Sequence, residues 1–272
     1  MALGSRLLAL GALGIALASD LSAQQPSKDS SFFKKGDGKL SVAVLAGAVA
    51  LSAFDVRIAN WSRQPRIQGD SSRHDLVRSV TVVNEMPLTV AAVVTYGVGR
   101  LTKSRTIADV GLHLTESLVA TTLVAEAVRV GLGRERPRAN AADQYSFAPG
   151  RGFSRFENRA FPSLHAGVAF ATAATLVAEI RMRNPSATRY AAPLLYGAAM
   201  VPGLTRVYLD QHWASDVVAG TFIGALIGNR VVRYAHGRRT RLDRWLLGGQ
   251  ARILPGPDGV LVVISLPGQP TK

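Results

Sequence analysis

Three short segments carry arginine, histidine, hydroxyl and carboxylate side chains within about ninety residues of one another. They are Arg129 with Arg136-Pro137, then Pro162-Ser163-Leu164-His165, then Thr205-Arg206 with His212 and Asp216. Arginine offers a planar fork of donors that matches phosphate oxygens. One imidazole can attack phosphorus while a second protonates the leaving oxygen. This inventory points to phosphoryl transfer that needs no metal.

The spacing in the third segment predicts that two of these side chains meet. His212 and Asp216 are four residues apart, so on a helix they share one face and lie within side-chain reach. A carboxylate in that position can hold an attacking imidazole in the correct tautomer. The residues from Trp213 to Val232 are mostly apolar, which supports a helix that begins here.

The first two segments predict a loop arginine and a helix N-terminus. Glycines and a proline lie between and just after Arg129 and Arg136, so we expect a helix to end between them, with Arg136 on the following loop. Pro162-Ser163 precedes the apolar run from Leu164 to Ile180, which places His165 in a first helical turn. Free N–H groups and the positive end of the helix dipole attract phosphate there.

With these spacings the sequence resembles the type 2 phosphatidic acid phosphatase and vanadium haloperoxidase superfamily. Six residues separate Arg129 from Arg136-Pro137, five separate Arg206 from His212, and three separate His212 from Asp216. The resemblance implies that His212 is a nucleophile that forms a phosphohistidine and that Asp216 orients it. It implies that His165 is first the general acid and then the base. The implied phosphate-binding groups are Arg129, Arg136, Ser163, Arg206 and the backbone amide of Leu164.

Three positions depart from the family's pattern. Arg129 stands where the family has lysine, which keeps the charge, and Thr205 stands where it has serine, which keeps the hydroxyl. Leu164 stands where it has glycine, and a left-handed backbone there would be strained for leucine. A bulky residue at this position resembles the lipid-phosphate branches of the superfamily.

The resemblance implies a phosphatase that hydrolyses a phosphomonoester or a pyrophosphate on a lipid, such as a phosphatidic acid-like lipid or a prenyl pyrophosphate, without a cofactor. Four alternatives stay open: a vanadium-dependent haloperoxidase, a lipid phosphotransferase, a secreted non-specific acid phosphatase, and a membrane scaffold that binds anions but has lost turnover through Leu164. A small phosphoester is the alternative substrate class. The oligomeric state is not visible in the sequence.

The remaining histidines have no candidate partner residues near them in the sequence. His74, His113 and His236 have no partners at useful spacing, so we interpret them as structural. No pair of histidines at metal-ligand spacing comes with a third ligand, so we expect no zinc and no other metal. Asp210 is only two residues before His212, which directs it to another helix face. The sequence has no cysteine, which excludes disulfides and thiolate metal sites.

Charge and hydropathy indicate a membrane or phosphorylated partner. The formal net charge is +14, which favours anionic partners. No helix shows a basic stripe interleaved with aromatic residues, so we do not expect nucleic acid. Hydrophobic residues make up 47% of the chain and the mean hydropathy is +0.16, a high value for a soluble enzyme.

The chain divides into four predicted parts. Residues 1–23 resemble a secretory signal peptide, 24–38 are a polar linker, 39–240 form the helical phosphatase domain, and 241–272 are a tail. The basic residues at the ends of the apolar segments indicate a site on the outer side, whereas a cleaved signal peptide would start the first helix outside and reverse this orientation. Giving more weight to the basic residues, we expect an exported, membrane-associated enzyme whose site faces the periplasm or the exterior, with a soluble periplasmic enzyme as the alternative.

Six apolar segments predict an all-α fold, a six-helix bundle of the phosphatidic acid phosphatase/haloperoxidase type. They are Leu40–Phe54, Met86–Val98, Asp109–Val130, Leu164–Ile180, Ala191–Leu204 and Trp213–Val232. We expect two long loops, 55–85 and 138–160, the second carrying aromatic residues that form a wall for an acyl or prenyl chain. In the tail, a β-rich run around Pro255 to Gly259 predicts a short β-hairpin.

Overall fold

The computed structural model describes residues 32–33, 36–81, 84–237, 250–256 and 259–265. The predicted signal peptide, residues 1–23, lies outside these residues, as does most of the predicted linker, residues 24–38. The predicted tail, residues 241–272, is described only in part. The division of the chain into these parts therefore stays a prediction.

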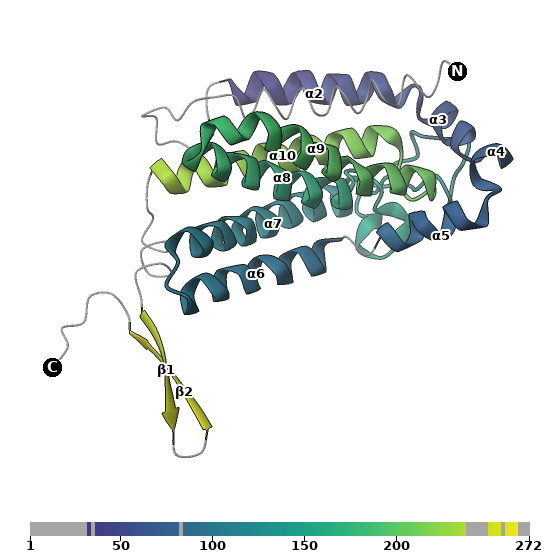
Figure 1. The fold of residues 1–272 in the computed structure, drawn as a ribbon. Helices are drawn as coiled ribbons and strands as arrows, with labels where there is room; N and C mark the ends of the chain where they lie inside the picture. Colours follow the sequence, from purple (N-terminus) through teal and green to yellow (C-terminus); the bar gives the residue numbers. More distant parts are fainter. Residues whose placement is uncertain (1–31, 34–35, 82–83, 238–249, 257–258, 266–272) are drawn as a thin grey trace.

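Six long helices form the body of the described chain, as the apolar segments predicted (Figure 1). They are α2 (Asp37–Ser52), α6 (Glu85–Leu101), α7 (Arg105–Leu132), α8 (Leu164–Arg183), α9 (Pro185–Tyr208) and α10 (Ala214–Gly237). Side-chain caps begin several of them: Asn84 caps α6, Ser104 caps α7, and Ser163 caps α8. The predicted all-α bundle is confirmed.

Close packing of α8 on α10 builds the centre of the bundle. A Cβ added at Gly224 of α10 would lie 1.9 Å from the carbonyl oxygen of Gly167 on α8, and one added at Gly220 would lie 2.2 Å from the carbonyl oxygen of Ser163. Only residues without a side chain allow backbones to approach this closely. The glycines therefore bring the start of α10 against the start of α8, where two of the three motifs lie.

Two apolar clusters hold the outer helices on this central pair. One joins α2, α8, α9 and α10 through residues such as Val44, Phe170, Tyr196 and Phe222. The other joins α6, α7 and α8 through Ala92, Leu118 and Val168, among others. At about 25 cal/mol per Å² of buried apolar surface, such clusters are the main stabilising term of the fold.

The segment 55–85, which we predicted to be a loop, contains three short helices: α3 (Asp55–Ser62), α4 (Pro65–Gln68) and α5 (Ser71–Val80). The sequence did not predict these helices, because the segment is rich in charged residues and lacks a long apolar stripe. Asp70 caps α5 by accepting a hydrogen bond from the backbone N–H of Arg73. The second predicted loop, 138–160, is irregular apart from the 3₁₀ turns η1 (Arg151–Phe153) and η2 (Phe156–Asn158).

The tail contains the antiparallel pair β1 (Gln250–Gly256) and β2 (Gly259–Ser265). Ile253 pairs with Val262 in its middle and Gly256 pairs with Gly259 at its turn. The β-rich run around a Pro/Gly/Asp turn predicted this hairpin.

Two of the described helices, α7 and α10, are long and apolar enough to cross a membrane, and the bent pair α2 and α3 would raise the number to three if it forms one span. Apolar side chains also cover the outside of the bundle. Large exposed ones lie on α2, α6, α7 and α9: Val42, Leu45, Val49, Val90, Val93, Val94, Val119, Leu123, Leu194 and Val201. Large apolar side chains exposed on four helices are consistent with a surface that meets a membrane or a partner.

Candidate active site

One end of the bundle gathers all three motifs. The C-terminus of α7 supplies Arg129, the N-terminus of α8 supplies His165, and the turn into α10 supplies His212. Gly133, with φ +66°, ends α7 by donating its N–H to the carbonyl of Arg129, so the helix stops between the two arginines as predicted. The loop 133–160 then runs across this end, and Arg136 lies on it.

His212 is buried, with only 1% of its surface exposed, and its ring is held by one hydrogen bond. Nδ1 lies 2.7 Å from the carbonyl oxygen of Ala160, an acceptor, so Nδ1 carries the proton. Nε2 is therefore the unprotonated nitrogen, and it is buried with no hydrogen-bond partner among the described residues. Burial first, and then the charges of Arg136 and Arg129, lower the pKa of His212 well below 6.5, which keeps the ring neutral.

Asp216 lies near His212 but directs its oxygens elsewhere. Its Oδ2 is 3.7 Å from Nδ1 of His212 and accepts a hydrogen bond of 2.8 Å from the backbone N–H of Trp213. Its Oδ1 accepts a bond of 2.6 Å from Arg134. The carbonyl of Ala160, 52 residues upstream of His212, thus receives the bond that the spacing suggested for the carboxylate. Asp216 contributes its negative charge at short range and fixes the turn at the start of α10.

Arg134 and Asp55, which sequence reasoning missed, complete a buried network behind Asp216. Arg134 donates to Asp55 at 2.9 Å, to Asp216, and to the hydroxyl of Ser215 at 2.8 Å. Two further bonds go to the carbonyl of Gln144, at 2.9 and 2.7 Å. Arg134 could have been suspected from its place two residues before Arg136, whereas nothing in the sequence marks Asp55.

His165 lies in the first turn of α8, as predicted, beside Arg206. The guanidinium of Arg206 donates to its Nε2, while Nδ1 is buried without a partner among the described residues. Ser163, the cap of α8, is fully buried and accepts from the N–H of Ala166 at 3.5 Å. Burial first, then Arg206 and His212, lower the pKa of His165 to about 2. A bound dianion would reverse the effect of the arginines and favour the protonated ring.

Three arginines surround the histidines. Arg129 and Arg136 both donate to the carbonyl of Arg159, at 3.0 and 3.4 Å, and Arg136 also donates to the side chain of Gln211 at 2.9 Å. Nε of Arg206 is buried without a partner in the described chain. Burial and the charge of Arg129 lower the pKa of Arg136 to about 9. Positive charges crowded in this way are stabilised by an anion placed between them.

The Leu164 side chain does not block this arrangement. It is 4% exposed and packs in the cluster between α6, α7 and α8, so it points away from the histidines. Outside glycine, the described residues with positive φ are Lys103 and Asp210, so the strain that we considered for Leu164 does not arise. Asp210, as expected, stands outside the site, where it forms an ion pair of 2.8 Å with Arg63.

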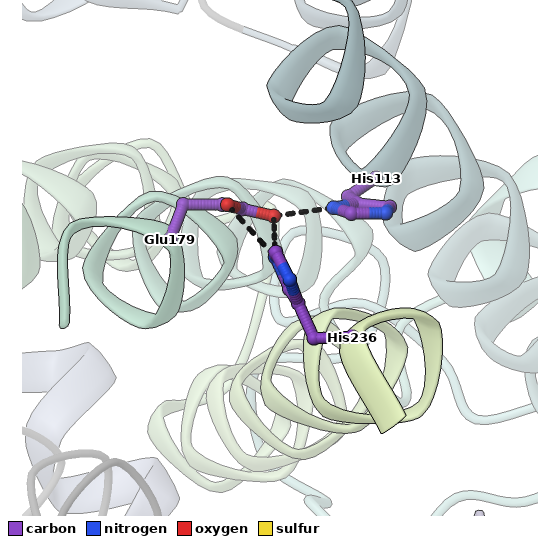
Figure 2. Close-up of side chains that lie close together, drawn as sticks. All are labelled: His113, Glu179 and His236. Atoms are coloured by element: carbon purple, nitrogen blue, oxygen red, sulfur yellow. Dashed lines mark hydrogen bonds and ion pairs between the residues drawn. The ribbon is translucent and has the colours of Figure 1, made fainter. Parts of the chain in front are cut away.

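His113 and His236, which we interpreted as structural because the sequence shows no partners for them, do have a partner in the fold. Helix packing brings both against Glu179 at the other end of the bundle (Figure 2). Separations of 66 and 57 residues from Glu179 hide this grouping from any search for metal-ligand spacing. His74 instead lies near Tyr208, with the ring centroids 6.2 Å apart.

Comparisons with known proteins find a family model and several curated relatives that match this chain. Residues 110–240 match the model of the PAP2 superfamily. A lipid A 1-phosphatase of Porphyromonas gingivalis is 28% identical over 183 residues, 66% of this chain and 35% of that protein. A lipid A 1-phosphatase of Rhizobium johnstonii is 33% identical over 120 residues, 43% of this chain and 44% of that protein. The chain thus spans less than half the length of each of these relatives.

A solved structure shares the fold. The crystal structure of a transmembrane PAP2 type phosphatidylglycerolphosphate phosphatase from Bacillus subtilis matches with a TM-score of 0.52 at 19% identity. The match covers 74% of this chain and 98% of that one. At this identity the likeness concerns the helical architecture alone.

Proposed function

We propose that this chain, which belongs to the PAP2 superfamily through residues 110–240, is a metal-independent phosphatase that removes phosphate from a lipid. One observation carries the proposal: Nε2 of His212 is buried and unprotonated beside a group of arginines, and it has no hydrogen-bond partner in the part of the chain that the structure describes. A buried polar atom without a partner costs free energy unless a ligand supplies the missing interaction. An electrophilic phosphorus held by the arginines would do so.

In the first step Nε2 of His212 attacks phosphorus and the bond from phosphorus to the leaving oxygen breaks. His165, protonated once the dianion is bound, gives its proton to that oxygen. In the second step His165 takes a proton from water, the water oxygen attacks phosphorus, and the bond to Nε2 breaks. Phosphate leaves and both rings return to their starting state. Arg129, Arg136 and Arg206 stabilise the negative charge in both transition states.

Exposed aromatic residues beside the site support a lipid substrate. Phe153 and Phe156 of the loop 138–160 are 74% and 57% exposed, and the ring of Phe156 lies 4.2 Å from the guanidinium of Arg136. A lipid chain in contact with these rings would leave its phosphate at the arginines. We expect Phe153→Ser to lower hydrolysis of a lipid phosphate several-fold and to spare a small aryl phosphate; equal loss on both would contradict the lipid assignment.

The apolar exterior supports membrane association. Basic residues such as Arg100, Arg105, Arg181 and Arg233 lie at the end of the bundle opposite the candidate active site. By the positive-inside rule that end is cytoplasmic, and the site then faces the periplasm or the exterior. Recovery of the protein in the membrane fraction after a carbonate wash tests the association, and recovery in the soluble fraction would favour the soluble alternative.

The central experiment is phosphate release by the purified protein with EDTA present. Substrates are a lipid A 1-phosphate, phosphatidylglycerol phosphate, a prenyl pyrophosphate and a small aryl phosphate. We expect release that His212→Ala abolishes and His74→Ala preserves, because His74 lies outside the site. Acid-labile, base-stable phosphate on the wild-type protein after a rapid quench identifies the intermediate. No release from any substrate, or equal release by His212→Ala, would refute the mechanism.

A further inference from the structure

Three helices converge on a second cluster of ligand-type side chains, at the end of the bundle opposite the active site (Figure 2). It consists of His113 of α7, Glu179 of α8 and His236 of α10. His165 and Glu179 are 14 residues apart on α8, about 21 Å at 1.5 Å per residue. The cluster is therefore separate from the phosphate site and has no part in the chemistry proposed there.

We propose that His113, Glu179 and His236 bind one divalent transition-metal ion, best matched by zinc, which ties α7, α8 and α10 together. Each residue offers one ligand atom, and the three atoms lie within 4.8 Å of one another. Two imidazoles and one carboxylate are a donor set that zinc accepts, with water in the remaining position. The inference does not depend on the phosphatase activity.

The spacing between His236 and Glu179 suits a shared ion, and His113 contacts the same carboxylate directly. Nε2 of His236 is 3.3 Å from Oε1 and 3.2 Å from Oε2 of Glu179. Ligands at about 2.0–2.1 Å from a tetrahedral zinc lie about 3.4 Å from one another. Nδ1 of His113 approaches the same Oε1 from the other side, and the imidazole rings meet at 65° with centroids 5.4 Å apart. Figure 2 shows both rings directed at the carboxylate rather than stacked on each other.

The surroundings would support the ligands. Glu179 is only 2% exposed, and a buried carboxylate needs compensating charge. Arg183 pairs with its Oε2, while Oε1 faces both histidines; Nε2 of His236 also lies 3.2 Å from Oε2. Arg183 also faces Asp109 at 3.6 Å, so its charge is shared between two carboxylates. A divalent ion would supply the remaining positive charge that the buried carboxylate of Glu179 needs. Arg183 would then orient this carboxylate toward the ion.

One of the three ligands is open to solvent, so an ion can reach the cluster from that side. His113 and Glu179 are buried, whereas His236, near the end of α10, is exposed to solvent. An ion can therefore reach His236 first and then displace any proton shared between the inner pair. Because the ligands come from three different helices, binding would resist separation of these helices at this end.

The test measures zinc bound by the untagged, full-length protein in detergent, by titration calorimetry and by metal analysis after dialysis against micromolar zinc. We expect one equivalent per chain and a rise in the unfolding midpoint of about 5–11 °C at 100 times Kd, which stabilises by about 2.7 kcal/mol. His236→Ala removes an exposed ligand at little cost in packing, and Glu179→Gln removes the charge. Each should weaken binding at least about tenfold. Arg183→Met should weaken it about 10- to 100-fold.

Two controls keep the assignment specific. His74→Ala and His212→Ala, which change histidines away from the cluster, should each retain one equivalent. Loss of zinc in His212→Ala would place the ion at the phosphate site and overturn the proposal. No bound zinc in the folded wild type, or unchanged affinity in both His236→Ala and Glu179→Gln, would reduce the cluster to a hydrogen-bonded group. Phosphate release by metal-free His236→Ala keeps this result distinct from the test of the phosphatase.

Discussion

Replacing Arg134 by methionine tests whether the buried network behind Asp216 holds the site together. Arg134 is 2% exposed and connects two buried carboxylates, those of Asp55 and Asp216, at 2.9 and 2.6 Å. Removing one member of a buried ion pair costs about 3–5 kcal/mol, because the remaining charge stays in a poor solvent. For a chain of this size about 1 kcal/mol moves the unfolding midpoint by about 2–4 °C. We therefore expect Arg134→Met to lower the midpoint by about 6–20 °C.

The chain offers a matched control in the same loop. Arg138 forms an ion pair with Glu157, but both side chains are about two-fifths exposed, at 39% and 41%. Exposed pairs contribute about 0–1 kcal/mol, so Arg138→Met should change the midpoint by no more than about 4 °C. Thermal unfolding in detergent, followed by circular dichroism, compares the two variants directly.

A double-mutant cycle separates the network from the loss of packing. If Arg134 stabilises by neutralising buried carboxylates, Asp55→Asn should cost less in the Arg134→Met background than alone. The expected interaction free energy is at least about 1 kcal/mol. Additivity within about 0.5 kcal/mol, or an Arg134→Met midpoint equal to that of Arg138→Met, would refute this account of the site.

Three further predictions follow from the packing and charge of the site. The pKa of His165 is lowered to about 2 and that of His212 lies well below 6.5, so only the unfolded chain gains their protons just below pH 6.5. Stability should be retained above pH 6.5 and fall below it by at most about 2.7 kcal/mol per pH unit, measured by denaturant unfolding. Burial raises the pKa of Asp55 to about 6, so this carboxyl gains its proton in the folded state and opposes the fall. Compared with the wild type, His165→Gln should lose less stability on acidification, by up to about 1.4 kcal/mol per pH unit. Arg206→Ala should lower kcat/KM about 10²- to 10³-fold in the phosphate-release assay, because a donor to the developing charge is lost. Gly224→Ala should destabilise by about 1–3 kcal/mol in thermal unfolding, since its Cβ would lie 1.9 Å from a backbone oxygen of α8, whereas Gly197→Ala meets open space and should be neutral or stabilising.

Each of these has a clear contrary result. An identical pH dependence of stability in the wild type and in His165→Gln would mean that the imidazole of His165 is not buried in neutral form. If Arg206→Ala leaves kcat/KM unchanged while KM and kcat rise together, Arg206 binds the substrate but does not stabilise the transition state. Equal stability of the Gly224→Ala and Gly197→Ala proteins would mean that α8 and α10 are not in backbone contact.

Local patterns in the sequence predicted the helices and the neighbourhood of the site. The i, i+4 spacing of His212 and Asp216 and the cap at Ser163 depend only on helix geometry, which is the same in every protein. The six apolar segments became the six long helices because each is long enough to bury one face. The segment 55–85 was misjudged as a loop, because short charged helices leave no long apolar stripe to detect.

Contacts between segments that lie far apart in the chain could not be predicted from the sequence. The carbonyl of Ala160 that holds His212 is 52 residues away, and Asp55 is 79 residues from Arg134. A backbone carbonyl has no signature in the sequence, because every residue has one. The pairing of Asp55 with Arg134 requires that α3 fold back over the end of the bundle, which the amino-acid order alone does not reveal.

The sequence by itself determined the helical class of this protein and the set of side chains that could perform phosphoryl transfer, because both follow from residue type and from spacings within one or two helical turns. The tertiary structure alone decided which groups hold those side chains and that His113, Glu179 and His236 share one place. Those facts depend on how closely α8 and α10 approach through their glycines, and only the packed backbone sets that distance.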